Sequence, residues 1–416
     1  MPVTLLITLF LLLAIALIGY RISGMPKNVW LLFMAQPLAL SSASMMVMAG
    51  GLLGAEIAPS PQYATIPLTL MILSTAAGVF PAALLMKRYG RRKGTLIGLA
   101  CAVIGALIAA YSAIKQDFYW LILGAVNLGF SMAFVAQMRF AVIESLAEVK
   151  DIPKAISILM IGSMFAAVLG PEMAVLGKEW INSPFGYAGS FIGLAVMIVV
   201  SMALVSTLAP IGVAEQKQDL KQRQLSQIIK QPIFVIAVCA GAVAYGVMSY
   251  VMTASPLSMH QINHHDLDAT KWVIQSHIIA MYLPSLFSAV LIRYFGVSRL
   301  MAMGTLVYLV VIVVGLSGQA VMHYWWAMVL LGIGWNFLYT AGTVLLPETY
   351  RNSERFKVQA TNDFIIFFIQ AISSLAAGWI LFQWGWDGLI KLVIPAVVLM
   401  FLLSIWFLRL RPKNKP

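Results

Sequence analysis

The stretch Ala83-Leu84-Leu85-Met86-Lys87-Arg88-Tyr89-Gly90 decides the fold, because a similar stretch recurs about 205 residues later as Ala289-Val290-Leu291-Ile292-Arg293-Tyr294-Phe295-Gly296. In both, an apolar run ends in basic and aromatic residues followed by a glycine. Two further correspondences share nearly the same offset: Gly129 corresponds to Gly334, and Glu144 to Glu348. Three matches at one offset indicate that the chain consists of two similar halves.

The composition places both halves in a membrane. Of the 416 residues, 61% are hydrophobic and only 10% are charged. Apolar segments of roughly 20 residues recur along the whole chain, and each is long enough to cross the hydrocarbon core of a bilayer. Strands of a membrane barrel would alternate polar and apolar residues, so the spans are helices. We expect thirteen spans, at about 3–20, 28–55, 63–86, 94–114, 119–147, 154–177, 187–212, 231–259, 270–294, 298–317, 323–347, 356–382 and 387–408.

The predicted fold is therefore all-α and integral to the membrane, with two six-helix halves and one extra helix at the N-terminus. We expect the extra helix at 1–24, an N-terminal six-helix bundle at 25–214, a cytoplasmic linker at 215–230 and a C-terminal six-helix bundle with a short basic tail at 231–416. Two parallel six-helix repeats around a central cavity are typical of one large class of secondary transporters. Met25 is an alternative start, which would leave twelve spans.

The formal charge of +12 reflects topology and does not indicate a nucleic-acid partner. Most of the 27 basic residues fall in alternate loops, such as 87–93, 217–230 and 409–415. By the positive-inside rule these loops are cytoplasmic, which predicts a cytoplasmic C-terminus and, with thirteen spans, an N-terminus on the outer side of the membrane. The only two cysteines, Cys101 and Cys239, lie within expected spans and exclude a disulfide scaffold.

Residues 83–93 resemble the cytoplasmic loop signature of the major facilitator superfamily, with a small residue, a leucine, Gly90 and the basic run Arg91-Arg92-Lys93. The chain departs from that signature at Lys87, where the family has an acidic residue, and at Ala83, where it has a glycine. The resemblance implies the two-bundle transporter fold, but the charge latch of that loop is in doubt. Gly162, Gly170 and Pro171 are similar to the glycine-proline signature of the superfamily's antiporters, although such a pair also simply kinks a helix.

Several charged residues fall inside or near expected spans, where an ionisable group is a functional-site hypothesis. The residues with an expected coupling or conformational role are Arg91, Arg92, Arg139, Glu144, Glu172 and Asp363. Arg139 is equally consistent with a structural ion pair. Glu172 and Asp363 are the residues expected to carry protons or to compensate a bound cation.

Two ligand-like spacings are predicted to meet at one depth. Met248 and Met252 form one i,i+4 pair, and His277 and Met281 form another on the next, antiparallel helix. Met252 and His277 are each about seven residues, roughly 10 Å, from the outer surface. Three thioethers and one imidazole suit monovalent copper better than a hard cation. Methionines in apolar helices are otherwise packing residues.

Two further groups are expected to be accessory to a metal. The equivalent helix of the first half carries Met45, Met46 and Met48, and the repeat places Met46 opposite Met252. An outer loop contains His264 and His265, which would collect cations above the paired ligands or would simply form a polar loop.

The two ligand pairs resemble the MxxxM and HxxxM pattern of the CcoA-type copper importers, a bacterial branch of the major facilitator superfamily. Met138-Arg-Phe-Ala141, Gly170-Pro-Glu172 and Glu348-Thr-Tyr-Arg351 are also similar to that branch. The resemblance implies a copper ion as substrate transported across a bacterial inner membrane, which would make the N-terminus periplasmic. It also implies no permanent cofactor, and supply of copper to haem-copper oxidase assembly. A copper chaperone or oxidase assembly proteins would be the partners, and the transporter would act as a monomer in the lipid bilayer.

The sequence leaves alternatives open. The same branch contains riboflavin transporters, and a flat aromatic substrate would stack on Trp335 or Tyr339 and bond to Gln36 or Asn336. The Gly170-Pro171 pair is consistent with a drug/proton antiporter. A copper enzyme or non-transporting assembly factor is disfavoured because the sequence has no hydrophilic domain, haem-binding histidine pairs or nucleophile constellation, so we expect no catalytic residues.

Overall fold

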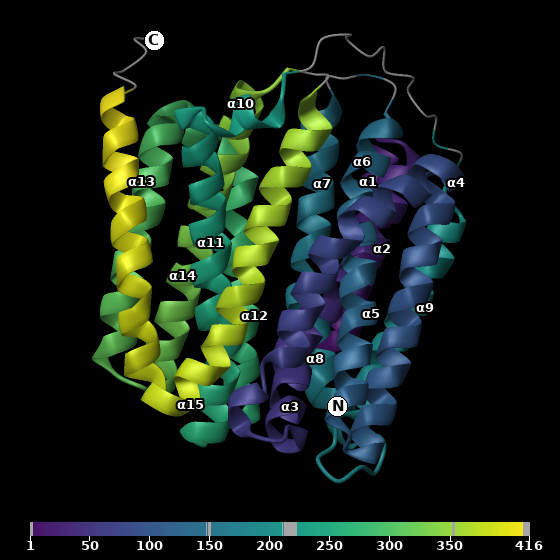
Figure 1. Cartoon of the computed structure of the whole chain (residues 1–416). Helices are drawn as coiled ribbons and strands as arrows, with labels where there is room; N and C mark the ends of the chain where they lie inside the picture. Colours follow the sequence, from purple (N-terminus) through teal and green to yellow (C-terminus); the bar gives the residue numbers. More distant parts are fainter. Residues whose placement is uncertain are drawn as a thin grey trace. The chain divides into compact units, whose positions relative to one another are not determined.

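The computed structural model describes residues 3–146, 148, 151–209, 211, 223–351 and 354–410, apart from the side chains of residues 87, 152, 153, 288, 289, 355, 356 and 410. Throughout this part of the chain every regular element is a helix (Figure 1). Within the described residues, eleven helices are long and apolar enough to cross a membrane. Residues 215–222 of the expected linker and the basic tail 411–416 lie outside the described residues.

The chain divides into two compact units. The first comprises Met1–Glu215 together with Asp266–Gln275, and the second comprises Gln216–His265 together with Ser276–Pro416. The helices of the first unit are α1 (Val3–Ile22), α2 (Lys27–Met45), η1 (Met46–Gly50), α3 (Gly51–Ile57), η2 (Pro61–Tyr63), α4 (Ile66–Lys115), α5 (Phe118–Ala136), α6 (Met138–Glu144), α7 (Ile152–Met164), α8 (Ala166–Leu176), η4 (Gly177–Glu179) and α9 (Ala188–Ser206).

The remaining helices belong to the second unit, except for α12, which begins in the first and ends in the second. They are α10 (Leu225–Ile229), α11 (Pro232–Pro256), η5 (Leu257–Ile262), α12 (Leu267–Tyr282), η6 (Leu283–Phe287), α13 (Ser288–Ser317), α14 (Val321–Leu345), η7 (Leu346–Thr349) and α15 (Arg355–Leu410).

Several of the thirteen expected spans differ from the helices of the structure; the expected spans 63–86 and 94–114, for example, form the single labelled helix α4, with Gly90 as its non-helical residue. The expected span 270–294 is interrupted, because α12 ends at Tyr282 and a 3₁₀ turn follows over Leu283–Phe287. Pro284 lies in this turn and has no backbone N–H to continue the α-helical ladder. The expected spans 356–382 and 387–408 form the single labelled helix α15, whose backbone leaves the helical region only at Gly385, with φ 68°.

The repeat is visible in the backbone. Gly90 in α4 and Gly296 in α13, which end the two similar stretches, have φ of 80° and 73° respectively. This conformation is strained for any residue with a Cβ atom and accessible to glycine. Each glycine therefore redirects the chain from one spanning segment into the next, at the same point of each half.

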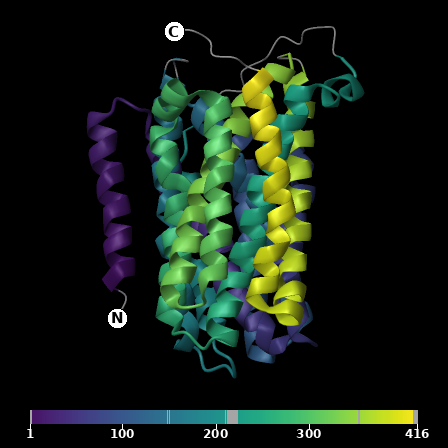
Figure 2. The same ribbon diagram turned by 90° about the vertical axis from the view of Figure 1, so that its left-hand side faces the viewer.

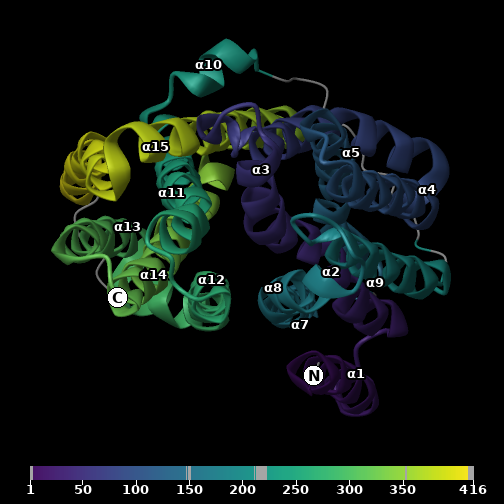
Figure 3. The same ribbon diagram turned by 90° about the horizontal axis from the view of Figure 1, so that it is seen from below.

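Helix α1 packs against its unit through one narrow face. Its buried residues are Leu5, Thr8, Leu12, Ala16 and Gly19, a stripe with helical spacing. A Cβ atom at Gly19 would lie 2.1 Å from the ring of Trp30, so this glycine sets the close approach of α1 to α2. Figure 2 shows α1, in purple, at the edge of the unit, and Figure 3 labels it beside α2. The rest of its surface is apolar and suited to lipid.

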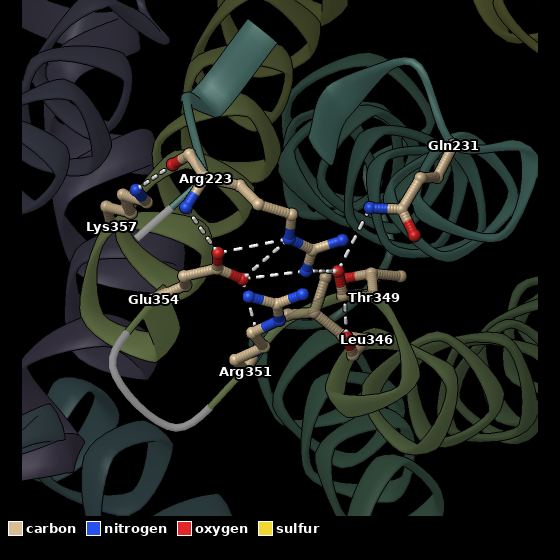
Figure 4. A network of polar contacts seen from close by, with 7 residues as sticks. All are labelled: Arg223, Gln231, Leu346, Thr349, Arg351, Glu354 and Lys357. Atoms are coloured by element: carbon tan, nitrogen blue, oxygen red, sulfur yellow. Dashed lines mark hydrogen bonds and ion pairs between the residues drawn. The ribbon is translucent and has the colours of Figure 1, made fainter. Parts of the chain in front are cut away.

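A buried carboxylate joins two segments of the second unit (Figure 4). Glu354 is fully buried, and its Oε2 atom lies 2.7 Å from Nη2 of Arg223. The backbone N–H groups of Arg223 and Arg351 also donate to this carboxylate, over 2.7 and 2.9 Å. Arg223 and Gln231 both donate to the carbonyl of Thr349, and Lys357 donates to the carbonyl of Arg223. These bonds tie the start of α10 and α11 to the turn between η7 and α15.

Candidate functional site

A cluster of aromatic rings in the second unit centres on α14. The rings of Trp335 and Tyr339 are stacked, with centroids 5.0 Å apart and planes 16° from parallel. Tyr245 of α11 lies edge-on to both, with its centroid 5.2 Å from each. Tyr282 of α12 lies 6.2 Å from Trp335, and Phe367 of α15 lies 6.1 Å from Tyr245. Four helices thus contribute to one aromatic cluster.

The two predicted methionine ligands lie on the same face of α11 as Tyr245. Residues Tyr245, Met248, Met252 and Ser255 have the spacing of a single helical stripe. At one end of this stripe Tyr245 packs on Trp335, and at the other Ser255 Oγ donates to Met328 Sδ over 3.2 Å. Met248 and Met252 are therefore set along the stretch of α14 that runs from Met328 to Trp335.

The second predicted pair lies against the same stretch of α14. His277 Nδ1 is 2.7 Å from the carbonyl oxygen of Met328, and the Asn336 side-chain amide donates to the carbonyl of Met281 over 2.7 Å. The two helices touch at Gly332, where a Cβ atom would lie 2.7 Å from the carbonyl oxygen of His277. Glycine at this position allows α12 to approach the backbone of α14 closely.

All four predicted ligands are buried, with Met248, Met252, His277 and Met281 no more than 8% exposed, and a shared metal site stays a prediction. His277 Nε2 has no hydrogen-bond partner among the described residues, and neither has Trp335 Nε1. Across the same part of the chain, no three His, Cys, Asp or Glu side chains form a group suited to a metal ion. The arrangement offers sulfur, one imidazole nitrogen, one indole N–H and broad aromatic faces.

The accessory methionines of the first unit are packed in its interior. Met45, Met46 and Met48 are all 0% exposed, and the last two lie in the π-helical segment η1. A Cβ atom at Gly50 would lie 2.5 Å from Met46 Sδ, so the Met46 side chain folds over this glycine. Short π-helical segments are common at functional sites. A metal role for these residues stays a prediction.

The two histidines expected at an outer mouth have different surroundings. His265 Nε2 is 2.8 Å from the carbonyl oxygen of Gln319, so this nitrogen holds the loop in place. His264 is exposed and has a φ of 54°, in the left-handed region. An accessory role for His265 would require its bond to Gln319 to open.

Arg91, in the basic run after Gly90, has an acidic partner in the first unit, and a conformational role for this pair stays a prediction. Arg91 Nη2 lies 2.7 Å from Glu144 Oε1 at the end of α6, and Arg91 Nη1 donates to Gln137 over 3.0 Å. Arg139 lies over the ring of Phe140 at 4.8 Å, and Arg92 donates to the carbonyl of Leu208. Arg91 is thus paired with Glu144, which lies on another helix. The family signature has an acidic residue within the loop itself, at the position of Lys87 in this chain.

The two acidic residues expected to handle protons both have polar neighbours. Glu172 of α8 forms an ion pair with Lys271 over 3.3 Å, and Gln275 donates to the same carboxylate over 3.4 Å. Asp363 accepts a bond of 3.0 Å from Asn362. A coupling role for either residue stays a prediction.

The glycine-proline signature of α8 serves close packing. A Cβ atom at Gly170 would lie 2.0 Å from Ser44 Oγ of α2, and one at Gly162 of α7 would lie 2.6 Å from the carbonyl oxygen of Phe33. Both glycines therefore allow neighbouring helices of the first unit to approach α2. This packing accounts for the glycines without an antiport function.

The expected polar contacts of a flat substrate need one correction. Asn336 has both amide hydrogens engaged, with Met281 and with Ser285, so it holds α14 to α12 and η6 and does not offer a donor. Gln36 accepts a bond from Ser163 within the first unit. Sequence reasoning missed Tyr245, Tyr282 and Phe367, although Tyr245 lies three residues before Met248 on the same helical face.

Comparisons with known proteins agree on the architecture. The sequence matches the family model of the Major Facilitator Superfamily over residues 31–258 and again over 238–416. It is 34% identical over 392 residues to the riboflavin transporter RfnT of Brucella anthropi, covering 93% of this chain and 97% of that protein. It is 28% identical over 349 residues to the uncharacterized MFS-type transporter YdeG of Bacillus subtilis, covering 80% and 79% of the two chains.

Two solved structures of transporters share the fold. A bacterial homolog of the human lysosomal transporter Spinster, in an inward-facing and occupied conformation, has a TM-score of 0.70 and 13% identity, covering 93% of this chain and 98% of that one. The nucleoside transporter NupG has a TM-score of 0.69 and 13% identity, covering 92% and 100%. At this identity the matches show the architecture alone.

Proposed function

This chain belongs to the Major Facilitator Superfamily and is a membrane transporter, and from that premise we propose that its cargo is a flat, fused-ring heterocycle of the riboflavin class. The observation that carries the proposal is the stacked pair Trp335–Tyr339, with Tyr245 and Tyr282 edge-on around it. The 34% identity to a riboflavin transporter supports the same cargo.

The aromatic cluster is physically suited to such a solute. Stacking a planar ring on an aromatic side chain contributes about 1–3 kcal/mol per ring in nucleic-acid complexes and requires no particular substituent. The sulfur atoms of Met248 and Met252, on the same face of α11 as Tyr245, add polarisable contacts at a ring edge. Alternating access by rocking of the two repeats would then expose the bound ring to either side of the membrane.

The test is riboflavin binding and uptake by the Trp335→Ala variant. Loss of one stacking surface should weaken binding by 1–2 kcal/mol, or about tenfold, measured by quenching of flavin fluorescence on the purified protein. Vesicle uptake of labelled riboflavin at low concentration should fall in parallel. Trp326→Ala is the matched control, because Trp326 lies on the same helix and is 50% exposed. Wild-type protein that neither binds nor carries riboflavin would refute the proposal.

Copper import is the second candidate, and one observation favours it. The Nε2 atom of His277 has no hydrogen-bond partner among the described residues and is buried. His277 lies against the stretch of α14 along which we also place Met248 and Met252. A neutral imidazole nitrogen and thioethers form a ligand set for monovalent copper. Met248→Leu and Met252→Leu keep the side-chain volume and remove the sulfur. Under the copper reading these variants lose radiocopper uptake while riboflavin uptake persists, and unchanged copper uptake would exclude it.

We also propose that the protein lies in a bacterial inner membrane with its C-terminus in the cytoplasm. The proposal rests on the concentration of lysine and arginine in alternate loops. A reporter that is active only in the cytoplasm, fused after residue 416, should be active, and an inactive fusion at normal protein levels would reverse the orientation.

A further inference from the structure

Helix α12 is shared between the two compact units. The segment Asp266–Gln275 belongs to the first unit and the chain from Ser276 onward belongs to the second, yet α12 is one continuous helix over Leu267–Tyr282. A continuous α-helix keeps its backbone hydrogen bonds only while its two ends move together. In a transporter whose repeats move against each other, α12 must therefore separate from one of the two units.

The C-terminal part of α12 is bonded to α14 through buried groups. Three hydrogen bonds of 2.7–2.9 Å join the two helices, and they pair Ser276 with Trp325, His277 with Met328, and Met281 with Asn336. At Gly332 of α14 the two backbones approach so closely that a Cβ atom would lie 2.7 Å from the carbonyl oxygen of His277. His277 and Asn336 are 0% and 2% exposed, so separation here would remove the partners of buried polar groups, which is costly.

The N-terminal part of α12 is held to α8 by the carboxylate of Glu172. Its Oε1 atom lies 3.3 Å from Lys271 Nζ and accepts a hydrogen bond of 3.4 Å from Gln275 Nε2. Both distances exceed those of well-formed hydrogen bonds, and the side chains of Glu172 and Lys271 are 13% and 16% exposed. Long contacts between partly exposed groups contribute less than short bonds between buried groups. The attachment to α8 is therefore the weaker of the two, and it is the one expected to break.

Lys271 keeps an acidic partner when α12 leaves α8. Its Nζ atom is also 2.9 Å from Oδ1 of Asp268, one turn earlier on the same helix. Because Asp268 moves with Lys271, separation exchanges the contacts of Glu172 for water without leaving the ammonium group unpaired. The bond between α8 and α12 can thus open and re-form at low cost.

We propose that Glu172 and Lys271 form a reversible catch, which holds the N-terminal part of α12 to α8 and opens in each transport cycle while α12 stays attached to α14. The catch requires movement of the two repeats but no particular cargo, so it goes beyond the proposed function. It gives Glu172 a conformational role that does not depend on its carrying a proton, and it gives Asp268 the role of second partner.

The test measures two distances by electron paramagnetic resonance on spin-labelled, full-length protein in lipid vesicles. The protein's own two cysteines are first replaced by serine. The first label pair replaces Glu179, shortly after α8, and Trp272 of α12, which are both exposed. The second label pair replaces Leu283, directly after α12, and Trp326 of α14, which are 45% and 50% exposed. The first pair reports on the catch, and the second reports on the attachment of α12 to α14.

Lys271→Met removes the ammonium group and keeps most of the length of the side chain. This variant should raise the fraction of molecules with a long distance between the first pair of labels by about two- to fivefold, as expected for loss of one partly exposed ion pair. The second distance should not change. Asp268→Asn is the matched control, because it removes the other charge that contacts Lys271 and leaves Glu172 in place. This control should keep or lower the fraction with the long distance.

A second variant and a salt series keep the test decisive if Lys271→Met does not fold. Glu172→Gln should also raise the fraction with the long first distance. In the wild type, raising the salt concentration from about 0.1 M to about 1 M should have the same effect, because the screening length falls from about 10 Å to about 3 Å. In either variant, salt should change the fraction little.

An unchanged first distance in the folded variants, or an equal lengthening of the second distance, would overturn the catch. Wild-type protein that does not bind riboflavin would overturn the proposed cargo alone, because neither distance measurement depends on the cargo.

Discussion

The contact at Gly332 provides a sharp prediction, because the geometry of the site depends on it. In Gly332→Ala the new Cβ atom would lie 2.7 Å from the carbonyl oxygen of His277, 2.9 Å from the backbone nitrogen of Met281 and 3.0 Å from Cβ of Ala280. Ordinary contacts of a Cβ atom begin at 3.4 Å. Two of the three neighbours are backbone atoms, so α12 as a whole must move away from α14 by roughly half an ångström or more.

The expected cost follows from two opposing effects. Overpacking against backbone costs about 1–3 kcal/mol, while alanine gains about 0.5–1 kcal/mol over glycine inside a helix. The net loss of stability is then about 1–2 kcal/mol. For a unit of about two hundred residues, 1 kcal/mol moves the unfolding midpoint by roughly 2–4 °C, so the midpoint should fall by about 2–8 °C. The movement also stretches the bonds from His277 to Met328 and from Asn336 to Met281.

The assay is thermal unfolding of the purified protein in detergent, followed by intrinsic fluorescence, with riboflavin binding measured on the same samples. Gly51→Ala is the control, because Gly51 is helical and a Cβ atom there meets nothing within 4 Å. The control should keep or raise the midpoint, since only the helix-propensity gain applies. A Gly332→Ala protein as stable as the Gly51→Ala protein would refute the close approach of α12 and α14.

Two further predictions concern the ion pairs. Hydrogen bonds from Arg223 hold the pKa of Glu354 at about 2, against 4.5 for an ordinary glutamate. The stability that the ionised carboxylate contributes is therefore fully present above pH 4.5 and is lost as the pH falls toward 2. Glu354→Gln should therefore lower the temperature midpoint of unfolding at pH 7 and weaken the dependence of this midpoint on pH between 4.5 and 2.5. A midpoint at pH 7 equal to that of the wild type would contradict the hydrogen-bond network around Glu354 and Arg223. Glu144→Gln removes the charge that holds Arg91, whose pair is 21–25% exposed, and should cost about 1 kcal/mol or less in thermal unfolding. A loss several times larger would mean that the latch does more than join two helices of the first unit.

The cytoplasmic loop shows how a sequence pattern can locate a feature without identifying its partner. The basic run after Gly90 marked the loop, but Lys87 in the usual acidic position cast doubt on its latch. The structure supplies the acidic partner from Glu144, 53 residues along the chain. Similarly, Glu354 lies among polar residues typical of a solvated loop, and only the fold shows that it is buried under Arg223.

Hydropathy, charge bias and the repeated glycines were enough to determine a helical membrane transporter with two similar halves, because these signals are local or periodic along the chain. The four residues of the methionine and histidine pairs are buried, but their role as ligands stays a prediction. Only the tertiary structure shows that α14 lies against both pairs and that Trp335, Tyr245 and Tyr282 gather there. Which buried atoms are left without a partner depends on contacts between helices distant in sequence. Such contacts leave no periodic pattern in the sequence from which they could be predicted.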